Sequence, residues 1–125
     1  MKTNETLHIP KSNGHYAMWV EHKGTLYLSG QLPIHPITKE VPVGIEAQTK
    51  LLLQNIELTL KEAGSSKNHI IRNEIFINDV AHWPTIDKVY ADFFGDYKPA
   101  RAVVGNAELH LGCLIEIVTT AAIIE

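Results

Sequence analysis

The sequence predicts an α+β or mixed α/β domain in which two amphipathic helices alternate with short β-strands. Residues 45–63 and 84–94 repeat apolar side chains at helical spacing. The segments around them are short runs rich in Ile, Val, Thr and aromatic residues, which is typical of strands. Because helices and strands are interleaved, we expect one sheet with both helices on one face. A chain of 125 residues can bury one core, so a single domain over residues 1–125 is expected, with a loose start over about residues 1–12.

The N-terminal half contains three predicted elements. Residues 16–21 and 25–29 are strand-like and are separated by a short polar turn, which predicts a hairpin. Residues 31–44 contain three prolines, which cannot donate to a ladder, so a loop with at most one short strand is expected. The helix over residues 45–63 ends before Gly64, the residue type preferred after a helix C-terminus.

The C-terminal half adds a strand over residues 69–77, a helix over residues 84–94 and two final strands over residues 101–107 and 113–124. The final strands are expected to pair with each other as a hairpin. Two helices on one face leave the other face of the sheet uncovered. The predicted last strand nevertheless places apolar residues on both faces. We therefore expect the second face to be buried against other subunits; the residues concerned are Ile115, Ile117, Val118 and Ile123.

Composition argues against several classes of function. No apolar stretch approaches the length of a membrane-spanning helix, and residues 1–5 do not resemble a secretory signal, so a cytoplasmic protein without membrane partners is expected. A net charge of −3 with only two arginines provides no basic stripe for nucleic acid. The seven histidines show no metal-binding spacing, and no glycine-rich phosphate motif occurs, so we expect neither a metal nor a cofactor. Cys113 is expected to be an inert core thiol.

Arg101 and Glu116 are the strongest candidates for chemistry. Each falls in a predicted apolar strand, where an unpaired charge is costly. The guanidinium of Arg101 matches a carboxylate, which could belong to a small ligand or to Glu116 itself. The residues alone leave both possibilities open. The turn at Ser29 and Gly30 could add a hydroxyl and free backbone N–H groups, although Gly30 could equally serve only to turn the chain.

These residues lie in motifs that together resemble the RidA/YjgF family of reactive-intermediate deaminases, formerly described as endoribonuclease L-PSP-like proteins. The ordered motifs cover nearly the whole chain; they are Gly14-His15-Tyr16, Leu28-Ser29-Gly30-Gln31-Leu32-Pro33, Phe76-Ile77-Asn78-Asp79, Tyr90-Ala91-Asp92-Phe93-Phe94, and Pro99-Ala100-Arg101 followed by Ile115-Glu116-Ile117.

The resemblance implies a chorismate-mutase-like α+β fold, a homotrimer with clefts between subunits, and a cofactor-free reaction. In that reaction enamines or imines such as 2-aminoacrylate or 2-iminopropionate are hydrolysed to 2-keto acids and ammonia. Arg101 matches the arginine that binds the substrate carboxylate, and Glu116 matches the residue for holding or deprotonating water. Tyr16 and Ser29 would add hydroxyl hydrogen bonds.

The chain departs from the family pattern at positions that bear on the substrate. Asp87 replaces a frequent asparagine, and Val103 replaces a frequent cysteine two positions after Arg101. His15 replaces proline before Tyr16, and residues 109–112 replace a Leu-Pro turn. The main alternative is a non-catalytic trimer that binds small carboxylates or partner proteins in the same cleft. A chorismate-mutase-like rearrangement would need more cationic side chains in the site. RNA cleavage would need a basic surface.

Overall fold

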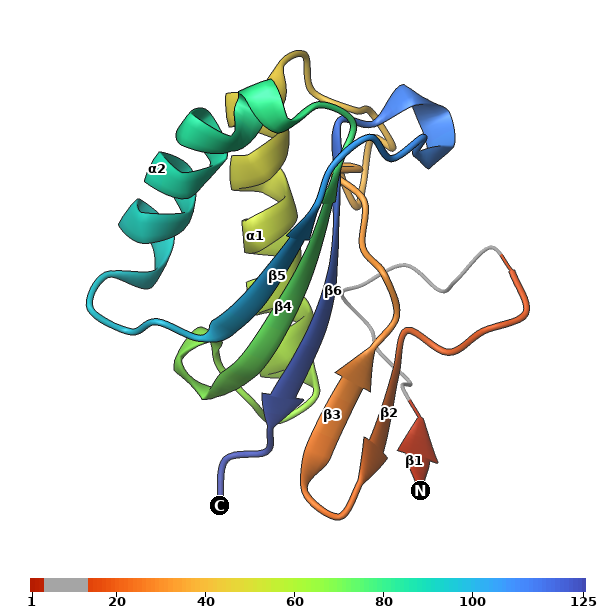
Figure 1. The fold of residues 1–125 in the computed structure, drawn as a ribbon. Helices are drawn as coiled ribbons and strands as arrows, with labels where there is room; N and C mark the ends of the chain where they lie inside the picture. Colours follow the sequence, from red (N-terminus) through yellow and green to blue (C-terminus); the bar gives the residue numbers. More distant parts are fainter. Residues whose placement is uncertain (4–13) are drawn as a thin grey trace.

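The computed structural model describes residues 1–3 and 14–125 and has the element order β-β-β-α-β-α-β-β (Figure 1). Every helix and strand expected from the sequence is present, and residues 31–44 form a loop. A further strand occupies residues 2–3, where a loose start was expected; residues 4–12 of that expectation lie outside the described residues. The elements are β1 (Lys2–Thr3), β2 (Trp19–His22), β3 (Thr25–Leu28), α1 (Ile45–Glu62), β4 (Ile70–Ile77), α2 (Trp83–Phe94), β5 (Ala100–Val104) and β6 (Ile115–Ala122).

The strands form one six-stranded sheet in the order β1-β2-β3-β6-β4-β5. All neighbours are antiparallel except β4 and β5, which are parallel and are connected through α2. The expected hairpin between the last two strands is therefore wrong. A parallel pair needs a crossover connection, usually a helix, and α2 supplies it. Strand β6 then inserts between β3 and β4, which places β4 between the two final strands.

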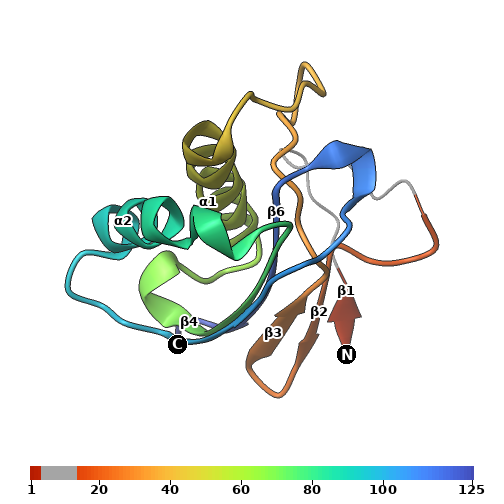
Figure 2. The same ribbon diagram turned by 45° about the horizontal axis from the view of Figure 1, so that its top comes forward.

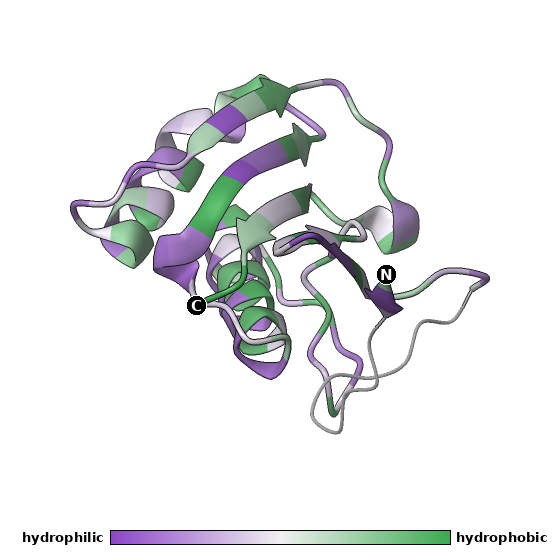
Figure 3. Cartoon of the chain, turned by 90° about the horizontal axis from the view of Figure 1, so that it is seen from below, coloured by the Kyte–Doolittle hydropathy of each residue, from purple (hydrophilic) through white to green (hydrophobic). Residues whose placement is uncertain are grey.

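Helices α1 and α2 lie on the same side of the sheet, as the sequence predicts (Figure 2). The strands carry both hydrophilic and hydrophobic residues (Figure 3). Ile115 and Ile117 are both fully buried in the core, where Ile123 packs as well, whereas Val118 is only partly buried and points to the other face. These apolar residues therefore lie on both faces of the sheet, as the sequence predicts: Ile115 and Ile117 share the helix-covered face, since positions two apart on a strand share a face, and Val118 lies on the other.

Both helices end where glycine permits a left-handed backbone. Gly95 follows α2 with φ 64°, and its N–H donates to the carbonyl of Ala91. Gly64 lies one residue beyond the C-cap of α1 with φ 89°. Neither helix of the described chain has the length and apolar content that a membrane crossing requires.

Candidate functional site

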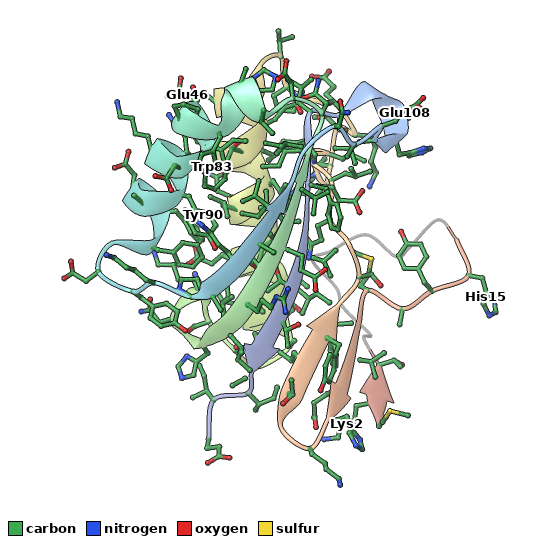
Figure 4. The ribbon with its side chains drawn as sticks, in the orientation of Figure 1. Lys2, His15, Glu46, Trp83, Tyr90 and Glu108 are labelled. Carbon is green, nitrogen blue, oxygen red and sulfur yellow. The ribbon has the colours of Figure 1, made fainter. Side chains whose placement is uncertain are left out.

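Arg101 lies on β5 with its side chain directed towards α2. Its partner in the parallel ladder is Asn73, which is fully buried on the helix-covered face, and paired residues share a face. The guanidinium carbon lies 4.5 Å from the centroid of the Trp83 ring and 5.3 Å from that of Tyr90. Both distances are short enough for an aromatic face to attract the cation. Figure 4 shows Trp83 and Tyr90 on α2.

Asp87 completes what we call the arginine cluster, which consists of Arg101, Asp87, Trp83 and Tyr90. Nη1 of Arg101 donates a hydrogen bond of 2.9 Å to Oδ1 of Asp87. Trp83, Asp87 and Tyr90 are spaced i, i+4, i+7, so one side of α2 presents all three to β5. Asp87 was expected near the site, whereas Trp83 and Tyr90 were not. Their helical spacing from Asp87 is the signal that could have found them.

Two buried hydrogen bonds connect Tyr90 of this cluster to β4 and β6. Oγ1 of Thr119 on β6 donates to Oδ1 of Asn73 at 2.7 Å, and Nδ2 of Asn73 donates to the hydroxyl of Tyr90 at 2.9 Å. Burial raises the pKa of Tyr90, although the hydrogen bond from Asn73 and the charge of Arg101 oppose that shift. The phenol is therefore neutral near pH 7 and offers the guanidinium an uncharged aromatic face.

A hollow of about 490 Å³ opens beside the cluster, between the C-terminal half of α2 and the start of β5. Its lining includes Tyr90, Phe94, Tyr97, Lys98 and Arg101. The guanidinium therefore borders open space on one side and aromatic rings on the other. Of its five N–H donors, the one bonded to Asp87 is engaged among the described residues. The remaining N–H groups can donate hydrogen bonds to the carboxylate of a ligand.

Glu116 lies on β6 and points to the opposite face of the sheet. Its ladder partner on β4 is Phe76. The residues on either side of Phe76, Ile75 and Ile77, are buried and face the helices, so Phe76 and Glu116 face away from them. Gly30 lies directly beside the carboxylate, because a Cβ atom added at Gly30 would be 2.4 Å from Oε2 of Glu116. Paired hydrogen bonds between Gln31 and Ile117, of 2.9 and 3.1 Å, hold the two segments together. Only glycine leaves room for the carboxylate in this position.

Ser29 directly precedes Gly30, and Tyr16 directly precedes Ala17, whose carbonyl the Ser29 hydroxyl contacts; we call Glu116, Gly30, Ser29 and Tyr16 the glutamate group. The Ser29 hydroxyl donates to the carbonyl of Ala17 at 2.7 Å, and the Ser29 N–H donates to that of Met18 at 2.9 Å. The Ser29 hydroxyl proton therefore holds the segment that leads into β2 and leaves the oxygen as an acceptor. Tyr16, one residue before Ala17, is 51% exposed. Its neighbour His15 lies far from Trp83 and Tyr90 (Figure 4).

The arginine cluster and the glutamate group do not meet within one chain. Strand β4 separates β5 from β6, so the two backbones are roughly 10 Å apart, and the side chains of Arg101 and Glu116 point to opposite faces. The alternative of a structural ion pair between Arg101 and Glu116 is therefore wrong, because Asp87 is the partner of Arg101. Val103 is on the same face as Arg101, two positions further along β5, and is 38% exposed.

Other candidate groups have ordinary structural roles. Cys113 is 2% exposed, and burial, with the nearby charge of Glu116, raises its pKa. The thiol is therefore protonated and a poor nucleophile, as the sequence predicts. Over residues 1–3 and 14–125, no three His, Cys, Asp or Glu side chains are grouped so as to hold a metal ion.

Comparisons with known proteins agree over nearly the whole chain. A family model described as Endoribonuclease L-PSP matches residues 6–123. A RutC family protein of Pyrococcus horikoshii is 37% identical over 113 residues, which is 90% of each chain. TdcF of Escherichia coli, named as a candidate reactive intermediate deaminase, is 34% identical over 119 residues, covering 93% of this chain and 92% of TdcF.

Solved structures of similar proteins have the same fold as this chain. RidA from an Antarctic Psychrobacter superposes with a TM-score of 0.93 at 30% identity, covering 98% of this chain and 100% of RidA. Escherichia coli TdcF with bound serine superposes with a TM-score of 0.91 at 33% identity, covering 98% of each chain. The α+β fold and the aligned sequence therefore lead to one assignment: the chain belongs to the RidA/YjgF family, which is also described as the endoribonuclease L-PSP or RutC family.

Proposed function

We propose that this protein hydrolyses small reactive enamines and imines, such as 2-aminoacrylate and 2-iminopropionate, to 2-keto acids and ammonia. The observation that carries the proposal is that the chain presents a restrained arginine beside an open hollow on one face of its sheet and a carboxylate against Gly30 on the other. The likeness to TdcF and RidA supports the same chemistry. A net charge of −3 does not favour RNA as the substrate.

In this reaction Arg101 binds the substrate carboxylate. Trp83 and Tyr90 hold the guanidinium plane, so little side-chain freedom is lost when the ligand binds. The positive charge also withdraws electron density from the adjacent carbon and favours attack there. The relative TdcF has been solved with serine, a small carboxylate, and by analogy we infer a ligand of this size for the present chain.

Glu116 acts as the base for water. The enamine first becomes an imine by moving a proton from nitrogen to carbon, and water then adds to the C=N carbon while Glu116 accepts a water proton. Glu116 returns this proton to the nitrogen and so completes the carbinolamine, whose hydroxyl proton then passes to the nitrogen as the C–N bond breaks and the C=O bond forms. Ammonia leaves and a 2-keto acid remains. This hydrolysis needs no redox step and no external cofactor.

Because Arg101 and Glu116 lie on opposite faces of one sheet, we infer that each site combines the arginine cluster of one subunit with the glutamate group of another. A homotrimer with three such clefts meets this requirement. The sheet face away from the helices carries apolar residues that a second copy would bury. Tyr27 and Val104 are 51% and 47% exposed there, and Phe76 and Val118 are partly buried.

The test measures keto-acid and ammonia release from 2-aminocrotonate or 2-aminoacrylate generated in situ by a pyridoxal-phosphate dehydratase. Arg101→Ala and Glu116→Gln should each lower the rate above the uncatalysed background by about a hundredfold or more. Lys88→Ala, an exposed change on α2, is the matched control and should keep the wild-type rate. If wild type only matches the uncatalysed rate while it still binds small carboxylates, the protein is a binding protein rather than a deaminase.

A further inference from the structure

The partner of Arg101 is itself a carboxylate, which changes what the site can hold. Asp87 and Arg101 form one hydrogen-bonded ion pair of 2.9 Å, and their side chains are 52% and 34% exposed. A guanidinium alone attracts any small carboxylate. Beside Asp87, an incoming carboxylate meets a pair whose charges sum to zero, so attraction by Arg101 is opposed by repulsion from Asp87.

The aromatic rings restrain the guanidinium beside the helix that carries Asp87. Trp83 and Tyr90 stack near the guanidinium at 4.5 and 5.3 Å, and both belong to the helix that carries Asp87. Tyr90 is fixed in turn by its hydrogen bond from Asn73. A carboxylate bound by Arg101 therefore remains close to Asp87.

A ligand relieves the repulsion if it carries a positive nitrogen next to its carboxylate. That nitrogen is two bonds from the carboxyl carbon, so a ligand whose carboxylate binds Arg101 would bring it close to Asp87, which touches Nη1. One oxygen of Asp87, Oδ1, accepts from Arg101, and Oδ2 remains to accept an N–H from the ligand. Such a ligand contributes one charge of each sign and matches both members of the pair.

We propose that Asp87 is a specificity residue that makes this site select 2-iminio and 2-amino carboxylates over carboxylates without a cationic nitrogen. The inference rests on the proposed function, and it names the ionised form of the substrate. A protonated imine is the more electrophilic form towards water, and an N–H hydrogen bond to Asp87 stabilises that form. No covalent step is added, because this proton stays on the nitrogen and leaves with it in the ammonia.

The experiment compares two ligands that differ only in this feature. L-Alanine and L-lactate carry an ammonium and a hydroxyl on the same carbon, and their dissociation constants can be measured by NMR titration. Wild type should bind alanine more tightly. In Asp87→Asn the ratio of the lactate to the alanine constant should fall by about fivefold or more, because a half-exposed charged hydrogen bond has been lost.

Asp92→Asn is the matched control, since Asp92 is an exposed carboxylate on the same helix. It should leave the ratio unchanged, and Arg101→Ala should weaken both ligands. An unchanged ratio in Asp87→Asn, or equal binding of both ligands by wild type, overturns the role of Asp87. If imine hydrolysis by wild type still depends on Arg101 in that case, the proposed function stands. If wild type neither binds these ligands nor hydrolyses imines, both fail.

Discussion

Mixing two inactive variants tests whether each site is shared between subunits. An Arg101→Ala chain keeps the glutamate group, and a Glu116→Gln chain keeps the arginine cluster. Within either chain the two groups lie on opposite faces of the sheet with β4 between their strands. Under the shared-site proposal, a functional site therefore forms only where an intact cluster of one chain meets an intact group of the other.

The expected recovery follows from counting interfaces in the proposed cyclic trimer. After random reassembly of equal amounts, half of the arginine clusters and half of the glutamate groups are intact. About a quarter of the sites then combine two intact halves, so about 25% of the wild-type rate should return.

The assay uses imine hydrolysis after the variants are unfolded and refolded together, with each variant refolded alone as the control. Differently tagged chains, separated by affinity and weighed by native mass spectrometry, establish that mixed assemblies formed. If mixed assemblies are present and their rate stays at the level of the two parents, the shared-site arrangement is refuted.

Three further predictions follow from individual contacts. Gly30→Ala should lower turnover by about a hundredfold, because its Cβ displaces the Glu116 carboxylate, while urea unfolding shows a stability change within about 1 kcal/mol. Asn73→Ala should reduce the free energy of unfolding by about 2–4 kcal/mol, because it removes two buried hydrogen bonds; an unchanged urea midpoint would contradict this. Burial raises the pKa of Tyr90 above 10.0, so the folded chain keeps a proton that the unfolded chain loses. Stability should therefore be constant with respect to this group below about pH 10 and fall above it, and Tyr90→Phe should remove that fall in urea unfolding at alkaline pH.

The helices were predictable because their signals are local. Apolar side chains recur at helical spacing over both segments, and Gly64 and Gly95 mark the ends with backbone angles that glycine prefers. The strand segments were recognisable for the same reason, since composition and alternation are local properties.

The pairing of the last strands was not predicted correctly, because strand partners are set by contacts between distant segments. The order strand, helix, strand over β4, α2 and β5 is itself the signature of a parallel unit, and it favours β4 as the neighbour of β5. Arg101 and Glu116 were therefore recognised as functional candidates, whereas their positions on opposite faces required the register of the sheet.

Strand β5, which carries Arg101, pairs only with β4 in the described chain and forms one edge of the sheet. Alternate amide protons of an edge strand point outwards and exchange with solvent unless something covers them. Strand β6, with neighbours on both sides, should retain its amide protons far longer. In a complete assembly that covers this edge, deuterium uptake along β5 should slow as protein concentration rises, while uptake along β6 stays constant. Exchange at this one strand would then report the formation of the cleft without any substrate.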